Sequence, residues 1–103
     1  MAPFSWLTRS IPTAGGSGLR FSNPSRTYNE TKRCISFWGY TSTFEVAFDL
    51  AEDALDRMSP NMEHDDANVL RVFDLNRARI EKAAGGAHQR NQKNYHWLAA
   101  SEF

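Results

Sequence analysis

The chain has little cysteine and no long apolar run. Its only cysteine is Cys34, among 103 residues. A single cysteine excludes an internal disulfide and a zinc site built from four thiolates, which fits a reducing cytoplasm. No apolar stretch approaches the roughly 20 residues that a membrane-spanning helix requires. We therefore expect a cytoplasmic protein without a membrane segment.

The sequence also lacks an excess of charge, because twelve basic residues balance twelve acidic ones. The charges are nevertheless segregated along the chain. Residues 1–33 hold five basic groups and one acid, residues 45–66 hold eight acids and one basic group, and residues 71–93 hold six basic groups and two acids. Such blocks allow charge complementarity within the chain or between subunits. Solvated faces that happen to segregate are the simpler interpretation.

The length predicts one domain preceded by a tail. Residues 1–18 contain two prolines and end in Gly-Gly-Ser-Gly, a composition typical of a flexible segment. Residues 19–103 then form the domain. Aromatic residues make up 13% of the chain, so they are expected to fill much of its core.

Alternating apolar residues predict a hairpin of two strands, at about residues 32–39 and 44–50. A short edge strand is expected at 19–21, and another strand from Tyr95 to Ala100. A short helix should follow the hairpin and end at Ser59-Pro60. A long helix should begin near Asp65 and end at Gly85-Gly86. This order indicates an α+β fold, with a small antiparallel sheet of three to four strands packed by two helices.

Several segments resemble one family of small bacterial proteins, domain-of-unknown-function family 1488. They are "LRFSNPSRTYNETKRCISFWGY", "FDLNRARI" and the closing "LAASEF". The resemblance covers about residues 19–103 and implies a compact α+β domain, with no established reaction or catalytic residues. The chain departs from the family pattern at Gly85-Gly86-Ala87-His88, where a bulky apolar residue and an aromatic are expected.

No group of residues has the spacing of a catalytic or metal site. His64, His88 and His96 include no pair at the i, i+4 helical spacing, and no second cysteine accompanies Cys34. We interpret Cys34 as a buried apolar residue. The acids at 49, 52, 53 and 56 are expected to form a solvated helix face. We therefore expect a protein that is not an enzyme and that has no cofactor or metal.

The first predicted strand has apolar residues at both its odd and its even positions, which face opposite sides of a sheet. This pattern indicates that both faces of the strand are covered. Ile35 and Phe37 match the inward parity of the second strand, whereas Trp38 and Tyr40 point the other way. Helices and tail could cover both faces, or the register could slip near Gly39. Alternatively, Trp38, Tyr40 and Trp97 form an interface with a second copy or another protein, since Trp and Tyr are favoured interface anchors. A non-catalytic binding or assembly module, as a homodimer, is our first functional hypothesis.

Nucleic-acid binding is the alternative hypothesis. Basic residues near both ends of the domain could combine with an aromatic ring into a cationic stacking surface. The residues concerned are Arg26, Lys32, Arg33, Arg90, Lys93 and Tyr95. The neutral net charge and the acidic middle of the chain argue against this hypothesis.

Overall fold

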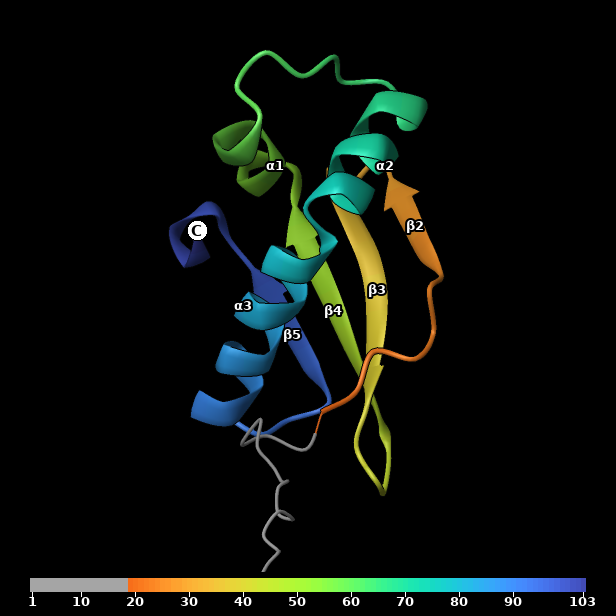
Figure 1. The fold of residues 1–103 in the computed structure, drawn as a ribbon, viewed down its shortest axis with the longest axis vertical. Coiled ribbons are helices and arrows are strands. Elements are labelled where there is room, and N and C mark those ends of the chain that lie inside the picture. The colour runs from red at the N-terminus through yellow and green to blue at the C-terminus, as the bar shows by residue number, and fades with distance from the viewer. Residues whose placement is uncertain (1–18) are drawn as a thin grey trace, which may run out of the picture.

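Four strands form a single sheet in the computed structural model, which describes residues 19–103. In the order in which they lie side by side, they are β2 (Arg26–Asn29), β3 (Cys34–Tyr40), β4 (Glu45–Ala51) and β5 (Tyr95–Leu98). Neighbouring strands are antiparallel from β2 to β4, whereas β5 runs parallel to β4 (Figure 1). The predicted tail at 1–18 lies outside the described residues.

The hairpin of β3 and β4 forms the centre of the sheet. Phe37 and Phe48 are partners in register and stack with ring centroids 5.2 Å apart. At the turn, the Thr41 hydroxyl accepts hydrogen bonds from the backbone N–H groups of Thr43 and Phe44, at 3.1 and 3.0 Å. Cross-strand aromatic pairs of this kind stabilise a hairpin beyond the area that they bury. The hairpin predicted from the alternation is confirmed.

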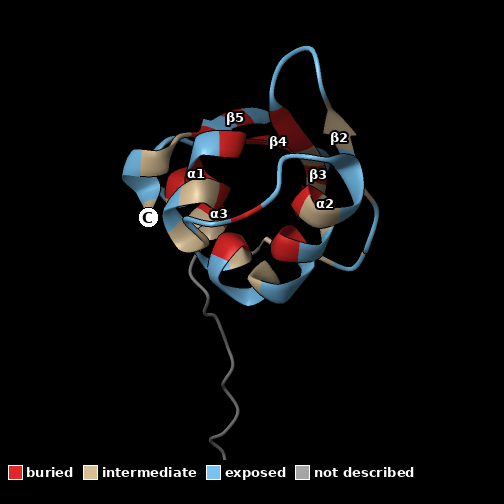
Figure 2. Cartoon of the chain, turned by 90° about the horizontal axis from the view of Figure 1, so that it is seen from above, coloured by how far each residue is buried: buried red, intermediate tan, exposed pale blue. Residues whose placement is uncertain are grey.

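The helices lie on one side of the sheet, as the view from above in Figure 2 shows. They are α1 (Glu52–Met58), α2 (Asp66–Leu75) and α3 (Arg77–Arg90), followed by the short 3-10 helix η2 (Ala100–Glu102). The core lies between the two layers, where Phe73 of α2 meets the ring of Phe37 edge-on at 5.3 Å. None of the helices within residues 19–103 is long and apolar enough to cross a bilayer.

The predicted α+β class is confirmed, but the long helix differs from the prediction. It is interrupted at Asn76, whose side-chain amide donates to the Val72 carbonyl at 2.9 Å. The chain then continues as α3 through Gly85 and Gly86 to Arg90, so the predicted stop at these glycines is wrong. Ala84, Ala87 and His88 are buried on this helix, and that packing outweighs the low helix propensity of glycine.

The direction of β5 also differs from the expected antiparallel sheet. Tyr95 pairs with Ala47, and Leu98 pairs with Leu50. Three helices separate β4 from β5, and the last of them returns the chain to the end of the sheet where β4 begins (Figure 1). A crossover connection through helices produces parallel neighbours, whereas a tight turn would produce antiparallel ones. The sheet is therefore mixed.

The predicted edge strand at 19–21 is reduced to one bridge, between Arg20 and Tyr40. This segment lies close to β3, because Gly39 has no side chain. A Cβ at Gly39 would be 2.9 Å from the Phe21 ring and 3.1 Å from a Leu19 methyl group. The close approach brings Phe21 within 6.0 Å of Phe37, between ring centroids. Gly39 thus allows residues 19–21 to pack against the core.

Two glycine-to-alanine substitutions should change stability in opposite directions. Gly39→Ala overpacks a closed contact and should lower the free energy of unfolding by about 1–3 kcal/mol. Gly85→Ala places its methyl group where nothing lies within 4 Å. It should raise the free energy of unfolding by about 0.8–1 kcal/mol through helix propensity. Urea denaturation of both variants measures the difference, and a change of the same sign in both would contradict this account of Gly39.

Candidate functional site

The face of the sheet away from the helices carries a group of aromatic side chains, which we call the open face. By strand alternation it contains Ser36 and Trp38 of β3, Ala47 and Asp49 of β4, and Tyr95 and Trp97 of β5. No helix among residues 19–103 lies over it (Figure 2). Tyr95 and Trp97 are 43% and 47% exposed, and Trp38 is partly exposed. These aromatic residues are therefore accessible to a partner.

Asp49 organises the polar centre of the open face. Its carboxylate accepts a hydrogen bond from the Ser36 hydroxyl at 2.5 Å and another from the Tyr95 hydroxyl at 2.9 Å. Although Asp49 lies on the uncovered side, it is only 8% exposed. Burial, and then the hydrogen bond to Asp49, raise the pKa of Tyr95 to about 12. The polar groups are thus satisfied within the sheet, and they hold the Tyr95 ring in place.

The register gives the open face its shape. Ala47 pairs with Trp38 on one side and with Tyr95 on the other. In the next row Asp49 lies between Ser36 and Trp97. On this face the strands beside β4 carry Trp38, Tyr95 and Trp97, whereas β4 itself carries Ala47 and the buried Asp49.

The structure places Trp38, Tyr40 and Trp97, predicted as an interface, on this same face by strand parity. Tyr40 lies at its margin, where its hydroxyl accepts a hydrogen bond from the Asn23 amide at 3.1 Å. Tyr95, which the sequence suggested only for nucleic acid, lies in the same row as Trp38, next to the row that contains Trp97. The alternation of β5 puts Tyr95 and Trp97 on one face of the strand. Which face of the sheet this is could be decided only by knowing that β5 pairs with β4.

The residues predicted to contact nucleic acid are not brought together. Three of them have acidic partners: Arg26 pairs with Asp74 at 2.7 Å, Arg33 with Glu52 at 3.1 Å, and Arg90 with Glu102 at 2.8 Å. Lys32 lies in the turn before β3, at the end of the sheet where β4 finishes. Lys93 precedes β5, at the end where β4 begins.

A second polar group, missed at the sequence level, surrounds Glu52 at the start of α1. This carboxylate is only 2% exposed. It accepts hydrogen bonds from the Tyr28 hydroxyl at 2.6 Å and from the Arg33 guanidinium at 3.2 Å, and it also contacts His64. Burial opposes the ionisation of Glu52, but the hydrogen bonds from Tyr28 and His64 and the charge of Arg33 lower its pKa. The expected solvated acidic face is therefore wrong for Glu52 and for Asp49.

His64 links two carboxylates. Its Nδ1 faces Glu52, and its Nε2 lies 2.7 Å from Asp56. Both carboxylates only accept hydrogen bonds, so the ring donates from both nitrogens and is positively charged. The hydrogen bond to Glu52 is the main cause that raises the pKa of His64. With both nitrogens used as donors, His64 has no lone pair for a metal ion or for proton abstraction.

The other two histidines contact each other. His88 Nδ1 and His96 Nε2 are 3.1 Å apart, and the residues are 2% and 4% exposed. The His96 ring stacks on Phe48 with centroids 5.3 Å apart. Burial lowers the pKa of His96. Among the described residues, no group of three or more His, Cys, Asp or Glu side chains is arranged to hold a metal ion.

Cys34 is fully buried, as expected from its interpretation as an apolar residue. Burial raises the pKa of its thiol, and the charge of Asp49 acts in the same direction. A thiol with a raised pKa is a poor nucleophile at neutral pH. Cys34 is therefore part of the packing between β3 and the end of β4, where Ala51 is its partner.

The comparisons with known proteins identify the family. The model for "Protein of unknown function (DUF1488)" matches residues 19–98, so the chain belongs to this family. A crystal structure of a protein of unknown function from the same family, from Shewanella loihica, is similar with a TM-score of 0.70. The match covers 80% of this chain and 92% of that chain at 13% sequence identity, which shows a common fold. No curated protein matches the chain.

The ion pairs of His64 should make stability depend on pH. The pKa of His64 is raised in the folded state above its ordinary value of 6.5. The ion pairs of protonated His64 therefore stabilise the fold fully below pH 6.5, and this stabilisation is lost as the pH rises through the raised pKa. The difference in unfolding free energy between the native chain and His64→Gln should therefore be largest below pH 6.5 and shrink as the pH rises above the raised pKa of His64. Chemical denaturation at several pH values measures this difference. A difference that grows with pH would contradict the assignment of His64 as doubly protonated.

Proposed function

We propose that this protein is a non-catalytic binding module that associates with a second copy of itself through the open face. The observation that carries the proposal is the group of accessible aromatic rings, Trp38, Tyr95 and Trp97, on a sheet face that no described helix covers. Exposed aromatic groups on a rigid surface are typical anchors of protein interfaces. The cytoplasmic location expected from the single cysteine is part of the same proposal.

The cost of burying this face is low, which favours association. The Tyr95 hydroxyl and the Asp49 carboxylate already satisfy each other, so a partner need not supply hydrogen bonds for them. Strands of a sheet also hold their side chains more rigidly than loops do, so less conformational entropy is lost on binding. Burial of the rings would then contribute to affinity with little loss of hydrogen bonds and little loss of side-chain entropy.

A second copy fits the shape and the charges of the open face. In a two-fold arrangement with antiparallel strands, Tyr95 and Trp97 of each copy face the open face of the other. The same rotation places Glu45, at the start of β4, near Lys32 of the partner copy, because these residues lie at opposite ends of the sheet. Opposite charges then meet at both margins of the interface.

The size of the face predicts a weak dimer. Four strands about 4.8 Å apart and about five residues long span roughly 19 Å by 17 Å. A standard interface buries about 800 Å² on each partner, and smaller ones are weak or transient. We therefore expect a dissociation constant on the order of micromolar or weaker.

Two observations support a role without catalysis. The histidine that is most accessible, His64, is held as a double donor between Glu52 and Asp56. The buried pair, His88 and His96, contact each other rather than a carboxylate. General acid–base chemistry needs a group directed at a substrate, whereas both N–H groups of His64 are directed at carboxylates of the chain itself and the other two histidines are buried.

Trp97→Ala should shift the protein toward the monomer. Removing an interface anchor costs about 2 kcal/mol, which corresponds to a dissociation constant about 30-fold weaker. Trp38→Ala should act in the same direction. Phe44→Ala is the matched control, because Phe44 is also 47% exposed but lies on the other side by strand parity. Sedimentation velocity over a range of concentrations measures the mass of each variant.

An equal effect of Phe44→Ala, or no effect of Trp97→Ala, would refute the open face as the interface. The aromatic rings could also stack with bases, so the same variants should be titrated with a fluorescent single-stranded RNA. RNA binding that Trp97→Ala abolishes and salt weakens, in a protein that stays monomeric, would assign the face to nucleic acid instead.

Charge reversal tests the antiparallel arrangement. Lys32→Glu and Glu45→Lys should each weaken the dimer by placing like charges at its margins. The double variant should restore the affinity of the native chain, because the pair is exchanged rather than removed. Sedimentation at low salt measures all three variants. Additive losses in the double variant would show that the two residues do not meet across the dimer.

A further inference from the structure

Two glycines occupy the interior of α3 without a steric reason. A Cβ on Gly85 would meet nothing within 4 Å, and one on Gly86 would meet only the Arg90 side chain at 3.5 Å. Neither glycine has a positive φ that would require glycine. Glycine is the least favourable residue in a helix after proline. Glycine at these two positions lowers helix stability and no packing contact requires it. Such exceptions to helix propensity are expected at functional sites, where the missing side chains leave space for a ligand.

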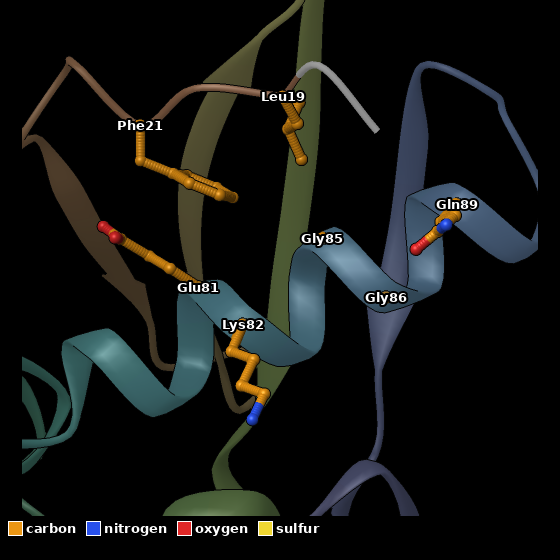
Figure 3. Close-up of a pocket in the computed structure, with 7 residues that line it drawn as sticks. All are labelled: Leu19, Phe21, Glu81, Lys82, Gly85, Gly86 and Gln89. Atoms are coloured by element: carbon orange, nitrogen blue, oxygen red, sulfur yellow. The ribbon is translucent and has the colours of Figure 1, made fainter. Parts of the chain in front are cut away.

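The space forms two adjoining hollows across α3. The first has a volume of about 380 Å³, and Figure 3 shows Leu19 and Phe21 on one side of it, with α3 passing beneath them. The second has a volume of about 420 Å³ and lies against the C-terminal residues Glu102 and Phe103. Gly86 and Lys82 line both hollows. Glu81 and Gln89 also line the first hollow, and the Glu81 carboxylate is paired with Arg77 at 2.9 Å. We call the part of this hollow between Leu19, Phe21 and Gly85 its apolar end, and Gly86 lies between this end and the charged second hollow.

The second hollow has a surplus of positive charge. Three basic residues of α3, Arg79, Lys82 and Arg90, line the second hollow together with the single acid Glu102. Arg90 pairs with Glu102 at 2.8 Å, and Arg79 lies over the Phe103 ring at 5.9 Å. Lys82 has no acidic partner within residues 19–103. It is therefore the cation available to a bound anion.

From this arrangement we infer that the groove across α3, formed by these two hollows, binds a small amphipathic anion. Its flat apolar body would lie on Gly85 against Leu19 and Phe21, and its carboxylate or sulfonate group would lie beside Lys82. The volumes fall within the roughly 300–1,000 Å³ of small-molecule sites, which are mostly apolar with a few polar groups that fix orientation. This site is separate from the open face, because α3 packs on the other side of the sheet (Figure 2).

The probe is anilinonaphthalene sulfonate, a fluorescent molecule with an apolar ring system and one anionic group. The full chain should bind it, and Gly85→Leu should weaken binding at least tenfold by filling the apolar end. Lys82→Glu should weaken it by a similar factor, whereas Lys82→Arg should retain it. Circular dichroism and the thermal midpoint show whether each variant is folded, and we expect the midpoint of Gly85→Leu to be no lower than that of the native chain.

Two controls separate this groove from other surfaces. Trp97→Ala changes the open face, and Arg71→Glu reverses an exposed charge on α2 without touching either hollow. Both should leave the affinity for the probe unchanged. Loss of binding in Trp97→Ala, with none in Gly85→Leu, would place the probe on the open face and overturn the inference. Absence of binding to the native chain would overturn it as well.

Discussion

A sheet has two faces, and the three α-helices within residues 19–103 cover only one of them. The apolar residues of β3 and β4 that face the helices, above all the stacked pair Phe37 and Phe48, bind the two layers together. The opposite face has aromatic rings, and no helix of the described part of the chain lies over it. Its central carboxylate, Asp49, is satisfied by Ser36 and Tyr95 within the sheet. The helices pack on one face of the sheet only, and the proposed interface on the other face follows from this constraint.

The fold was predictable from sequence wherever local periodicity decides the structure. The alternation of Val46, Phe48 and Leu50 predicts a strand with these three residues in the core, and the structure confirms it. Either Asp65 or Asp66 was predicted to cap the second helix, and in the structure Asp65 accepts the Asn68 backbone N–H at 2.9 Å. Both features depend on neighbouring residues alone, so no knowledge of the tertiary structure was needed.

Long-range pairing decided the features that the sequence did not predict. The parallel direction of β5 depends on where α3 returns the chain, and that position is set by packing. Glycine propensity indicated a stop at Gly85, but burial of Ala84 and His88 carries the helix further. The acids Asp49 and Glu52 were interpreted as solvated, because their partners are distant in sequence. Glu52, for example, binds Tyr28 from a strand 24 residues earlier.

The most direct measurement of the central claim is a dilution series followed by two-dimensional NMR of the backbone amides. If the open face binds a second copy, the signals that move or broaden with concentration will be those of Trp38, Ala47, Tyr95 and Trp97. Signals from α2 and from the outer surface of α3 will stay constant. Changes confined to the helices, or no changes up to millimolar concentration, would contradict the account.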